Sequence, residues 1–203
     1  MTDSGNDTYK TIAAPTTGNF RDRGSKFLAY AYPVATVQEV KNYVQALKQE
    51  HPKAVHHCFA YRIGADKMEF RANDDGEPSG SAGRPILGQI DSLGLTNTLV
   101  VVVRYFGGTL LGIPGLINAY KTVTAAALAE AQIIEKQVEL LVTLEFDYPV
   151  MGEVLHLLKQ SGATVYEQEL QLFCRIRAGV PLAAADACLA RLSEIRSVKA
   201  TRG

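Results

Sequence analysis

The densest group of residues that could carry chemistry lies in segment 73–88, NDDGEPSGSAGRPILG. The segment is rich in glycine, which lets the backbone adopt positive φ angles and approach a ligand closely. Successive backbone amides in such a loop can form a concavity that binds an anion. We therefore predict a loop that binds nucleic acid or phosphate. Its candidate contact residues are Ser79, Ser81, Gly83 and Arg84.

The same loop carries three carboxylates, Asp74, Asp75 and Glu77, which raises the question of a metal site. Oxygen ligands of this kind suit Mg²⁺. Adjacent aspartates can equally repel one another and stay in water, in which case the loop is a structural turn. We assign no metal and no cofactor, and the three carboxylates remain candidate ligands only. The loop is not a Walker A motif, because the chain has no GK[ST] sequence and no GxGxxG follows a strand here.

A second candidate segment, RYFGGTLLGIPGLINAY, follows an apolar run and leads into a predicted helix. A helix N-terminus offers free amides and the positive end of the helix dipole. An arginine here could contact a phosphate, and an aromatic ring could stack on a base. The candidate binding residues are Arg104, Tyr105, Gly107 and Gly108.

A structural interpretation of this segment is also open. Alternate residues of a strand face opposite ways, so at least one of Tyr105 and Phe106 is expected in the core. Arg104 would then pair with an acid such as Asp75.

A third segment, RDRGSK at residues 21–26, is a local basic cluster that precedes the first strand we predict. Its candidate contact residues are Arg23 and Lys26. Charge clusters are usually solvated surface. The cluster would therefore be functional only if the fold brings it close to the other two segments.

The histidines and cysteines do not indicate catalysis. His56 and His57 are adjacent on a predicted strand, so they point to opposite faces and do not readily bind one metal together. The three cysteines are far apart, no CxxC spacing occurs, and no GxSxG motif is present. We assign no catalytic residue, and we favour a protein that is not an enzyme.

The charge balance bears on the partner. The chain has 21 Lys and Arg residues against 21 Asp and Glu residues. A strongly basic domain would predict affinity for a phosphate backbone, so nucleic-acid binding here needs a local patch. The sequence has neither an apolar run long enough to cross a membrane nor the pattern of a signal peptide. We expect a cytoplasmic protein with no membrane partner, and the oligomeric state stays open.

The pattern of elements predicts an α+β protein of two domains, 1–135 and 136–203. In the first domain, Thr36 and Glu39 form a capping box that begins a helix. The helix ends at His51, because the residue before a proline is pushed out of helical geometry. Strands are expected over 26–34, 55–63, 68–71 and 98–106, a loop over 73–88, a helix from Pro114 to about Ala131, and a mobile tail over 1–12.

The pattern restarts after residue 136. Strands are expected over 138–146, 164–170, 172–178 and 197–201, with helices beginning at Pro149 and near Leu182. This order, βαββαβ, is typical of the ferredoxin-like fold. Such sheets often serve as recognition platforms for RNA or protein, although the fold hosts many unrelated functions.

Three of these segments, HHCFAYRI, DDGEPSGSAGRPIL and VVVRYFGGTLLG, resemble the signature of the IMPACT family in their order and separation. The resemblance covers roughly residues 20–130. The C-terminal part is similar to the domain appended in the bacterial, YigZ-type members, which resembles the fifth domain of elongation factor G. The chain departs from the family at Pro114-Gly115 and Asn118, where members often have a second glycine pair and a basic residue.

The resemblance implies a two-layer α/β first domain, like the second domain of ribosomal protein S-five and like the GHMP kinases. It also implies a regulatory role around translation, because eukaryotic relatives bind a regulator of a starvation-sensing kinase. It supplies no catalytic residues. We expect a translation-associated protein that binds RNA, the ribosome or a translation-related protein. The alternative is an enzyme that acts on a small phosphorylated metabolite through the acidic loop.

Overall fold

The computed structural model describes residues 7–202. These form two compact units, one of residues 9–136 and one of residues 137–202 together with residues 7 and 8. Both units combine sheets with helices, so the predicted α+β class is confirmed. No helix within residues 7–202 is long and apolar enough to span a membrane.

The first unit is built on a five-stranded sheet in which all neighbouring strands are antiparallel. The central strand is β6, whose side chains are buried from Thr98 to Arg104. Burial on both faces explains its nearly continuous apolar run. In sheet order the strands are β2 (Thr16–Asp22), β3 (Ser25–Pro33), β6 (Thr98–Tyr105), β4 (His56–Ile63) and β5 (Glu69–Asn73).

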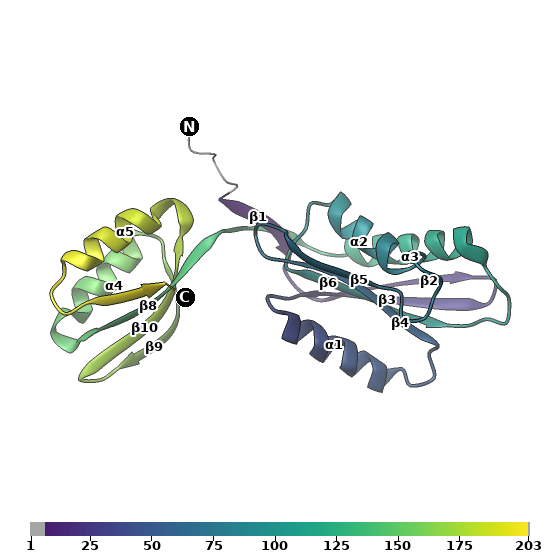
Figure 1. Cartoon of the computed structure of the whole chain (residues 1–203), viewed down its shortest axis with the longest axis horizontal. Coiled ribbons are helices and arrows are strands. Elements are labelled where there is room, and N and C mark those ends of the chain that lie inside the picture. Colours follow the sequence, from purple (N-terminus) through teal and green to yellow (C-terminus); the bar gives the residue numbers. More distant parts are fainter. Residues whose placement is uncertain (1–6, 203) are drawn as a thin grey trace. The chain divides into compact units, whose positions relative to one another are not determined.

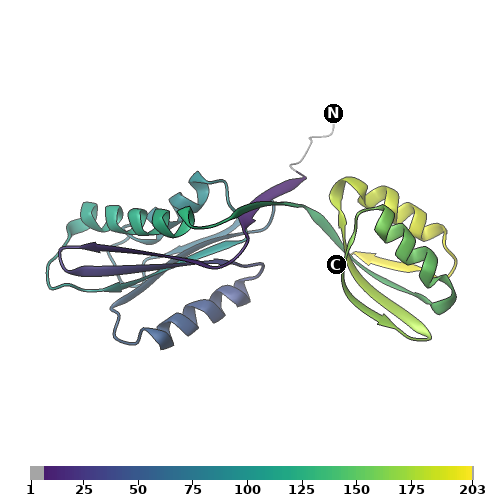
Figure 2. The same cartoon turned by 180° about the vertical axis from the view of Figure 1, so that it is seen from behind.

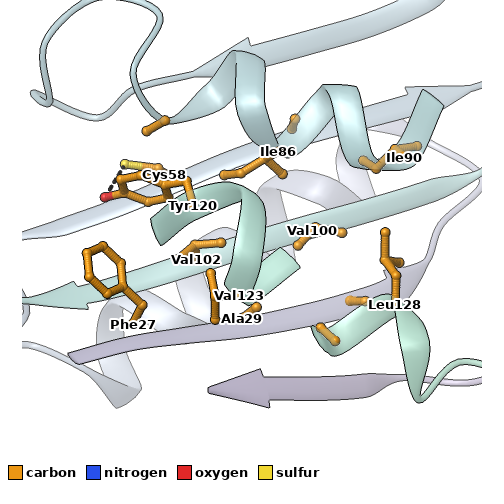
Figure 3. Close-up of a cluster of buried hydrophobic side chains, with 14 of the residues drawn as sticks. Phe27, Ala29, Cys58, Ile86, Ile90, Val100, Val102, Tyr120, Val123 and Leu128 are labelled. Carbon is orange, nitrogen blue, oxygen red and sulfur yellow. Dashed lines mark hydrogen bonds between the residues drawn. The ribbon is translucent and has the colours of Figure 1, made fainter. Parts of the chain in front are cut away.

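Helices cover both faces of this sheet, as Figures 1 and 2 show. Helix α1 (Val37–Glu50) packs on one face, and α2 (Gly83–Ser92) and α3 (Gly112–Ala129) pack on the other. The unit therefore has three layers instead of the expected two. Alternate residues of β6 serve the two cores, because successive strand residues point to opposite faces. Figure 3 shows the core beneath α2 and α3, which includes Phe27, Cys58, Ile86, Val102 and Tyr120.

Several local signals act as predicted. The Thr36 hydroxyl accepts a hydrogen bond from the Glu39 backbone amide, and the Glu39 carboxylate accepts one from the Thr36 amide, which completes the capping box. The helix ends at Glu50, and His51, directly before the proline, is its C-cap. The strands and helices expected after residue 26 are present within a few residues of their predicted ends, apart from the segment around Gly83.

Four elements depart from the predictions. The expected loop 73–88 contains the first turns of α2, which starts at Gly83. The basic cluster does not precede the first strand, because β2 lies before it and the cluster forms the β2–β3 turn. Strands β1 (Thr8–Ile12) and β7 (Ile133–Gln137) pair with each other. The predicted tail is therefore wrong for residues 8–12, where Ile12 is buried, and its residues 1–6 lie outside the described part.

The second unit has the predicted βαββαβ order and a four-stranded antiparallel sheet. Its strand order, β11-β8-β10-β9, is that of the ferredoxin-like fold. Helices α4 and α5 cover one face of the sheet, which leaves the other face open (Figure 2). The elements are β8 (Glu139–Asp147), α4 (Met151–Gln160), β9 (Thr164–Leu170), β10 (Phe173–Pro181), α5 (Leu182–Glu194) and β11 (Lys199–Arg202), with a short 3-10 helix at Tyr148–Val150.

Close packing of α3 on β2 generates a prediction about two glycines. A β-carbon at Gly18 would lie 2.5 Å from the backbone nitrogen of Ala127, whereas one at Gly88 in α2 would meet nothing within 4 Å. We expect Gly18→Ala to destabilise the first unit by about 1–3 kcal/mol through overpacking. Gly88→Ala is the matched control and should stabilise it by about 0.5–1 kcal/mol through helix propensity. Urea unfolding measures both, and equal effects of the two substitutions would contradict the predicted contact.

Candidate functional site

A buried ion pair between Glu77 and Arg104 lies at one end of the first sheet. The Arg104 Nη1 donates a hydrogen bond of 2.6 Å to the Glu77 Oε1, and the two side chains are only 6% and 3% exposed. The Tyr120 hydroxyl donates to the same oxygen at 2.7 Å. Paired charges with further hydrogen bonds are the form in which charge is tolerated inside a protein. The ion pair joins the first glycine-rich segment to the second.

Ser25 joins the basic cluster of residues 21–26, which forms the β2–β3 turn and is called the basic turn below, to this ion pair. Its hydroxyl lies 3.5 Å from the Arg104 Nη2 and accepts a hydrogen bond of 3.2 Å from the Gly107 backbone amide. The preceding residue, Gly24, touches the same loop, since a β-carbon at Gly107 would lie 1.9 Å from the Gly24 carbonyl carbon. All three predicted segments therefore meet at this end of the sheet. We call Ser25, His56, Glu77, Arg104 and Tyr120 the Glu77 cluster.

Phe106 extends from this cluster to the surface. The guanidinium carbon of Arg104 lies 5.4 Å from the centre of the Phe27 ring and 5.8 Å from that of Phe106. Phe27 is fully buried, whereas Phe106 is 48% exposed. The Arg104 side chain is therefore held between a core ring and a surface ring. The charge of Arg104 is therefore neutralised inside the protein by Glu77. The exposed aromatic residue of this segment is Phe106.

His56 approaches the cluster from the start of β4. Its Nδ1 lies 2.8 Å from the Asp75 carbonyl oxygen, so Nδ1 carries the proton in this bond, because a carbonyl only accepts. Its Nε2 lies 3.8 Å from the Glu77 Oε2, and the ring is partly exposed. As expected, His57 faces the other side of the sheet, where burial lowers its pKa.

Cys58 does not qualify as a nucleophile. Its thiol is buried within reach of the Asp74 carbonyl at 3.0 Å and the Tyr120 hydroxyl at 3.3 Å (Figure 3). Burial raises the pKa of Cys58 far above its ordinary value, which suppresses the reactive thiolate.

Asp74 serves the N-terminus of α2. Its carboxylate accepts backbone hydrogen bonds from Gly80 at 2.8 Å, Ala82 at 3.0 Å and Gly83 at 2.8 Å. The side chain of the N-cap residue, Ala82, cannot cap the helix, so a carboxylate from the preceding loop takes that role. Burial alone would raise the pKa of Asp74, but these hydrogen bonds and the Arg84 charge together hold it below its usual value.

The three loop carboxylates have separate partners. Asp75 accepts a hydrogen bond of 2.7 Å from the His57 backbone amide and pairs with Lys48 at 3.3 Å. Asp74 caps α2, and Glu77 pairs with Arg104. Within residues 7–202 no three His, Cys, Asp or Glu side chains are grouped to hold a metal ion. The alternative in which Arg104 pairs with an acid is correct in kind, but the acid is Glu77 and not Asp75.

The remaining candidates of the first loop differ in accessibility. Ser81 is buried and donates to the Pro78 carbonyl at 2.6 Å. The Gly83 amide already binds Asp74. Ser79 and Arg84 are exposed and remain accessible to a ligand.

Tyr105 and Lys26 lie on the face of the sheet that α1 occupies. They are cross-strand partners, and Arg21 lies opposite Lys26 on the next strand, so the three form a row. The Tyr105 hydroxyl lies 2.9 Å from the His51 Nδ1, and the His51 Nε2 lies 2.8 Å from the Tyr30 hydroxyl.

The sequence did not reveal this role of His51, whose visible signal was only its place before a proline. The sequence likewise did not reveal the roles of Ser25 and Tyr120 in the site, because the residues that their hydroxyl groups contact are distant in the chain.

The open sheet face of the second unit carries balanced charge. One row across its four strands reads Lys199, Glu145, Arg175 and Glu169. The next row pairs Arg177 with Glu167 at 3.0 Å. Because acids alternate with bases, this face offers no excess positive charge to a phosphate backbone. The basic turn, by contrast, has exposed cations that could contact a phosphate.

The buried ion pair generates a prediction about stability. Glu77→Gln should destabilise the first unit by about 3–5 kcal/mol, because the Arg104 charge stays buried without its partner. Asp91→Asn is the matched control, since Asp91 pairs with Arg62 at 2.6 Å but is itself 41% exposed. It should cost no more than about 1 kcal/mol. Chemical unfolding at pH 7 compares the two, and similar losses would contradict the structural role of the Glu77 pair.

The Asp74 cap generates a prediction about pH. The folded pKa lies below the reference value of 3.8, so the carboxylate stabilises the fold above that value and its contribution is lost as the pH falls through the folded pKa. Asp74→Asn should cost about 0.5–2 kcal/mol at pH 7, as for loss of a helix cap. The difference between the two proteins should shrink below about pH 4, and a constant difference from pH 7 to pH 3 would refute the assignment.

Comparison with known proteins identifies relatives along most of the chain. The Impact N-terminal domain model matches residues 23–128, which include the Glu77 cluster. The chain is 34% identical to the IMPACT family member YigZ of Escherichia coli K12 over 184 residues, or 90% of each protein. It is 38% identical to YvyE of Bacillus subtilis over 137 residues, which cover 68% of this chain and 63% of YvyE.

Two further comparisons define the extent of the likeness. Human Protein IMPACT is 38% identical over 96 residues, which cover 45% of this chain and 29% of that protein. A crystal structure of a hypothetical protein has a TM-score of 0.75 and 32% identity, and the alignment covers 96% of both chains. The domain model and the YigZ match together show that this chain belongs to the IMPACT family.

Proposed function

We propose that this chain is a translation-associated regulatory protein, and that the end of its first sheet binds RNA, free or in the ribosome. One observation carries the proposal: the basic turn is held against Gly107, the residue that follows the exposed Phe106, so the basic and aromatic residues come from adjoining backbone segments. Membership of the IMPACT family and the implied role of that family around translation support the regulatory part.

The chemistry of this surface fits a single-stranded nucleic acid. Arg21 and Arg23 are exposed and Lys26 is half-buried, so all three can reach phosphates. The exposed aromatic ring on the loop that the turn contacts gives a base a stacking partner, as in proteins that bind single strands with little sequence preference. The chain has no net charge, so this local patch would supply the attraction.

Arg104 has a positioning role in this proposal. Its charge is neutralised by Glu77 inside the protein, and it contacts both the buried Ser25 and the exposed ring of Phe106. The accessible Ser79 and Arg84 of the first loop are secondary candidates for contact. The proposed setting is the cytoplasm, where RNA and ribosomes are available.

A role as an enzyme on a phosphorylated metabolite gains no specific support. The loop carboxylates that motivated it are each held by a protein partner. The neighbouring Cys58 is buried with a raised pKa. A binding role does not depend on a free nucleophile or base.

Co-sedimentation with ribosomes from 50 to 300 mM salt tests the proposal. Binding should weaken steeply as salt rises, because phosphate contacts release counterions. The variant R21A/R23A/K26A should bind at least ten-fold more weakly at low salt. The slope of log affinity against log salt should fall by about 2 for three lost contacts to single-stranded RNA.

The matched control is K121A/K159A/R196A, which removes the same charge from three exposed positions elsewhere. It should sediment as the unmodified chain does. Phe106→Ala should weaken binding without changing the salt slope. Absence of binding at 50 mM salt, or equal losses in both triple variants, would refute the proposed surface.

A further inference from the structure

An apolar groove runs along α1 on the face of the first sheet opposite the Glu77 cluster. Its volume is about 210 Å³, and it lies between α1 and strands β4 and β5. The apolar part is formed by Val37 and Val44 of α1 and by Phe59 and Tyr61 of β4. The groove takes part in neither the Glu77 cluster nor the proposed RNA surface.

The groove exists because α1 covers only part of its sheet face. Val40 and Leu47 anchor α1 on the middle strands, where they share a core with Tyr61 and Val101. The outer strand β5 pairs only with β4, and every residue of it is exposed or half-buried. One side of α1 therefore faces bare sheet instead of another helix.

The α1 residues that line the groove recur at helical spacing from Val37 to Lys48. The eleven steps from Val37 to Lys48 span about 16 Å at roughly 1.5 Å per residue. This length matches three turns of a second helix, or five residues of an extended segment. A side-chain groove of this kind is how proteins take up amphipathic segments.

The charges around the groove indicate the chemistry of its occupant. Lys41 on α1 and Arg71 on β5 line it from opposite sides, are exposed, and form no ion pair within residues 7–202. Lys48 also lines it and pairs with Asp75 at 3.3 Å. The acid on the same face of β5 is Glu69, opposite Ile63. The cations thus exceed the acids around an apolar floor.

We propose that this groove docks an acidic amphipathic segment of a partner protein. Apolar side chains of the segment enter between α1 and β4, and its carboxylates pair with Lys41 and Arg71. Burial of apolar groups would give most of the affinity, and the unpaired cations would select acidic over basic segments. The chain would then hold RNA and a protein partner on separate surfaces.

The probe for the test is a fluorescent 16-residue helical peptide with leucines along one face and glutamates on both sides of them. A matched peptide with lysine in place of every glutamate is the comparison. Fluorescence anisotropy with the full chain should show saturable binding of the acidic peptide and at least ten-fold weaker binding of the basic one.

Charge reversal at the groove supplies the decisive variant. K41E/R71E changes two exposed side chains, so the fold should be retained, and it should reverse the preference between the two peptides. K159E/R196E is the control with the same charge change, and it should leave the preference unaltered. If the acidic peptide does not bind saturably, or both variants respond alike, the proposal is refuted.

A neutral variant separates this groove from the RNA surface. Val44→Ser keeps the charge and should lower peptide affinity at least three-fold while leaving ribosome co-sedimentation unchanged, with unfolding curves as the check on folding. If Val44→Ser and K41E/R71E weaken ribosome or poly(U) binding and leave the peptide unaffected, the groove belongs to the RNA surface and the docking proposal fails. Loss of RNA binding in the basic-turn variant, with peptide binding intact, would support two separate surfaces.

Discussion

The end of the first sheet depends on one constraint, the burial of the Glu77 carboxylate against the Arg104 guanidinium. A buried charge without its counter-charge is strongly unfavourable, so the loop that carries Glu77 and the strand that carries Arg104 must close on each other. Tyr120 brings α3 into the same contact, and Ser25 brings in the β2–β3 turn. Four segments that are distant in the chain are thereby held in one arrangement.

In this arrangement some charged side chains form contacts within the fold, and others stay accessible to a binding partner. Arg104, Asp74 and Glu77 are occupied inside the fold, although their residue types first suggested a binding site. Other cations stay at the surface, among them those of the basic turn and, on α1 and β5, Lys41 and Arg71. A chain of zero net charge can therefore present local positive regions, since acids such as Asp74 and Glu77 are held in contacts within the fold.

Glycine has a steric role at the contact between the turn and the loop. Gly24 and Gly107 approach so closely that no β-carbon fits at Gly107. The backbone of the turn consequently lies directly on the loop that carries the exposed ring of Phe106. Gly107 thus acts through close packing within the protein, whereas the sequence had suggested it as a binding residue.

Much of the architecture follows from local patterns. The α+β class, the capped helix at Thr36, the buried central strand and the βαββαβ order of the second unit are all visible in the sequence, because each depends on residues close together in the chain. The same is true of the family, whose motifs are contiguous. Of the candidate site, the sequence identified the three segments and predicted that Arg104 could pair with an acid.

The tertiary structure alone decided which groups meet. Strand β2 has the sequence TTGNFRD, with little apolar alternation, so its place at a sheet edge depends on pairing with β3 and packing under α3. Helix α2 starts in a glycine-rich loop because Asp74 caps it from outside the helix. The choice of Glu77 over Asp75 as the partner of Arg104 likewise depends on contacts across the fold. Composition and spacing describe neighbours in the chain, whereas burial and ion pairing are settled between residues that only folding brings together.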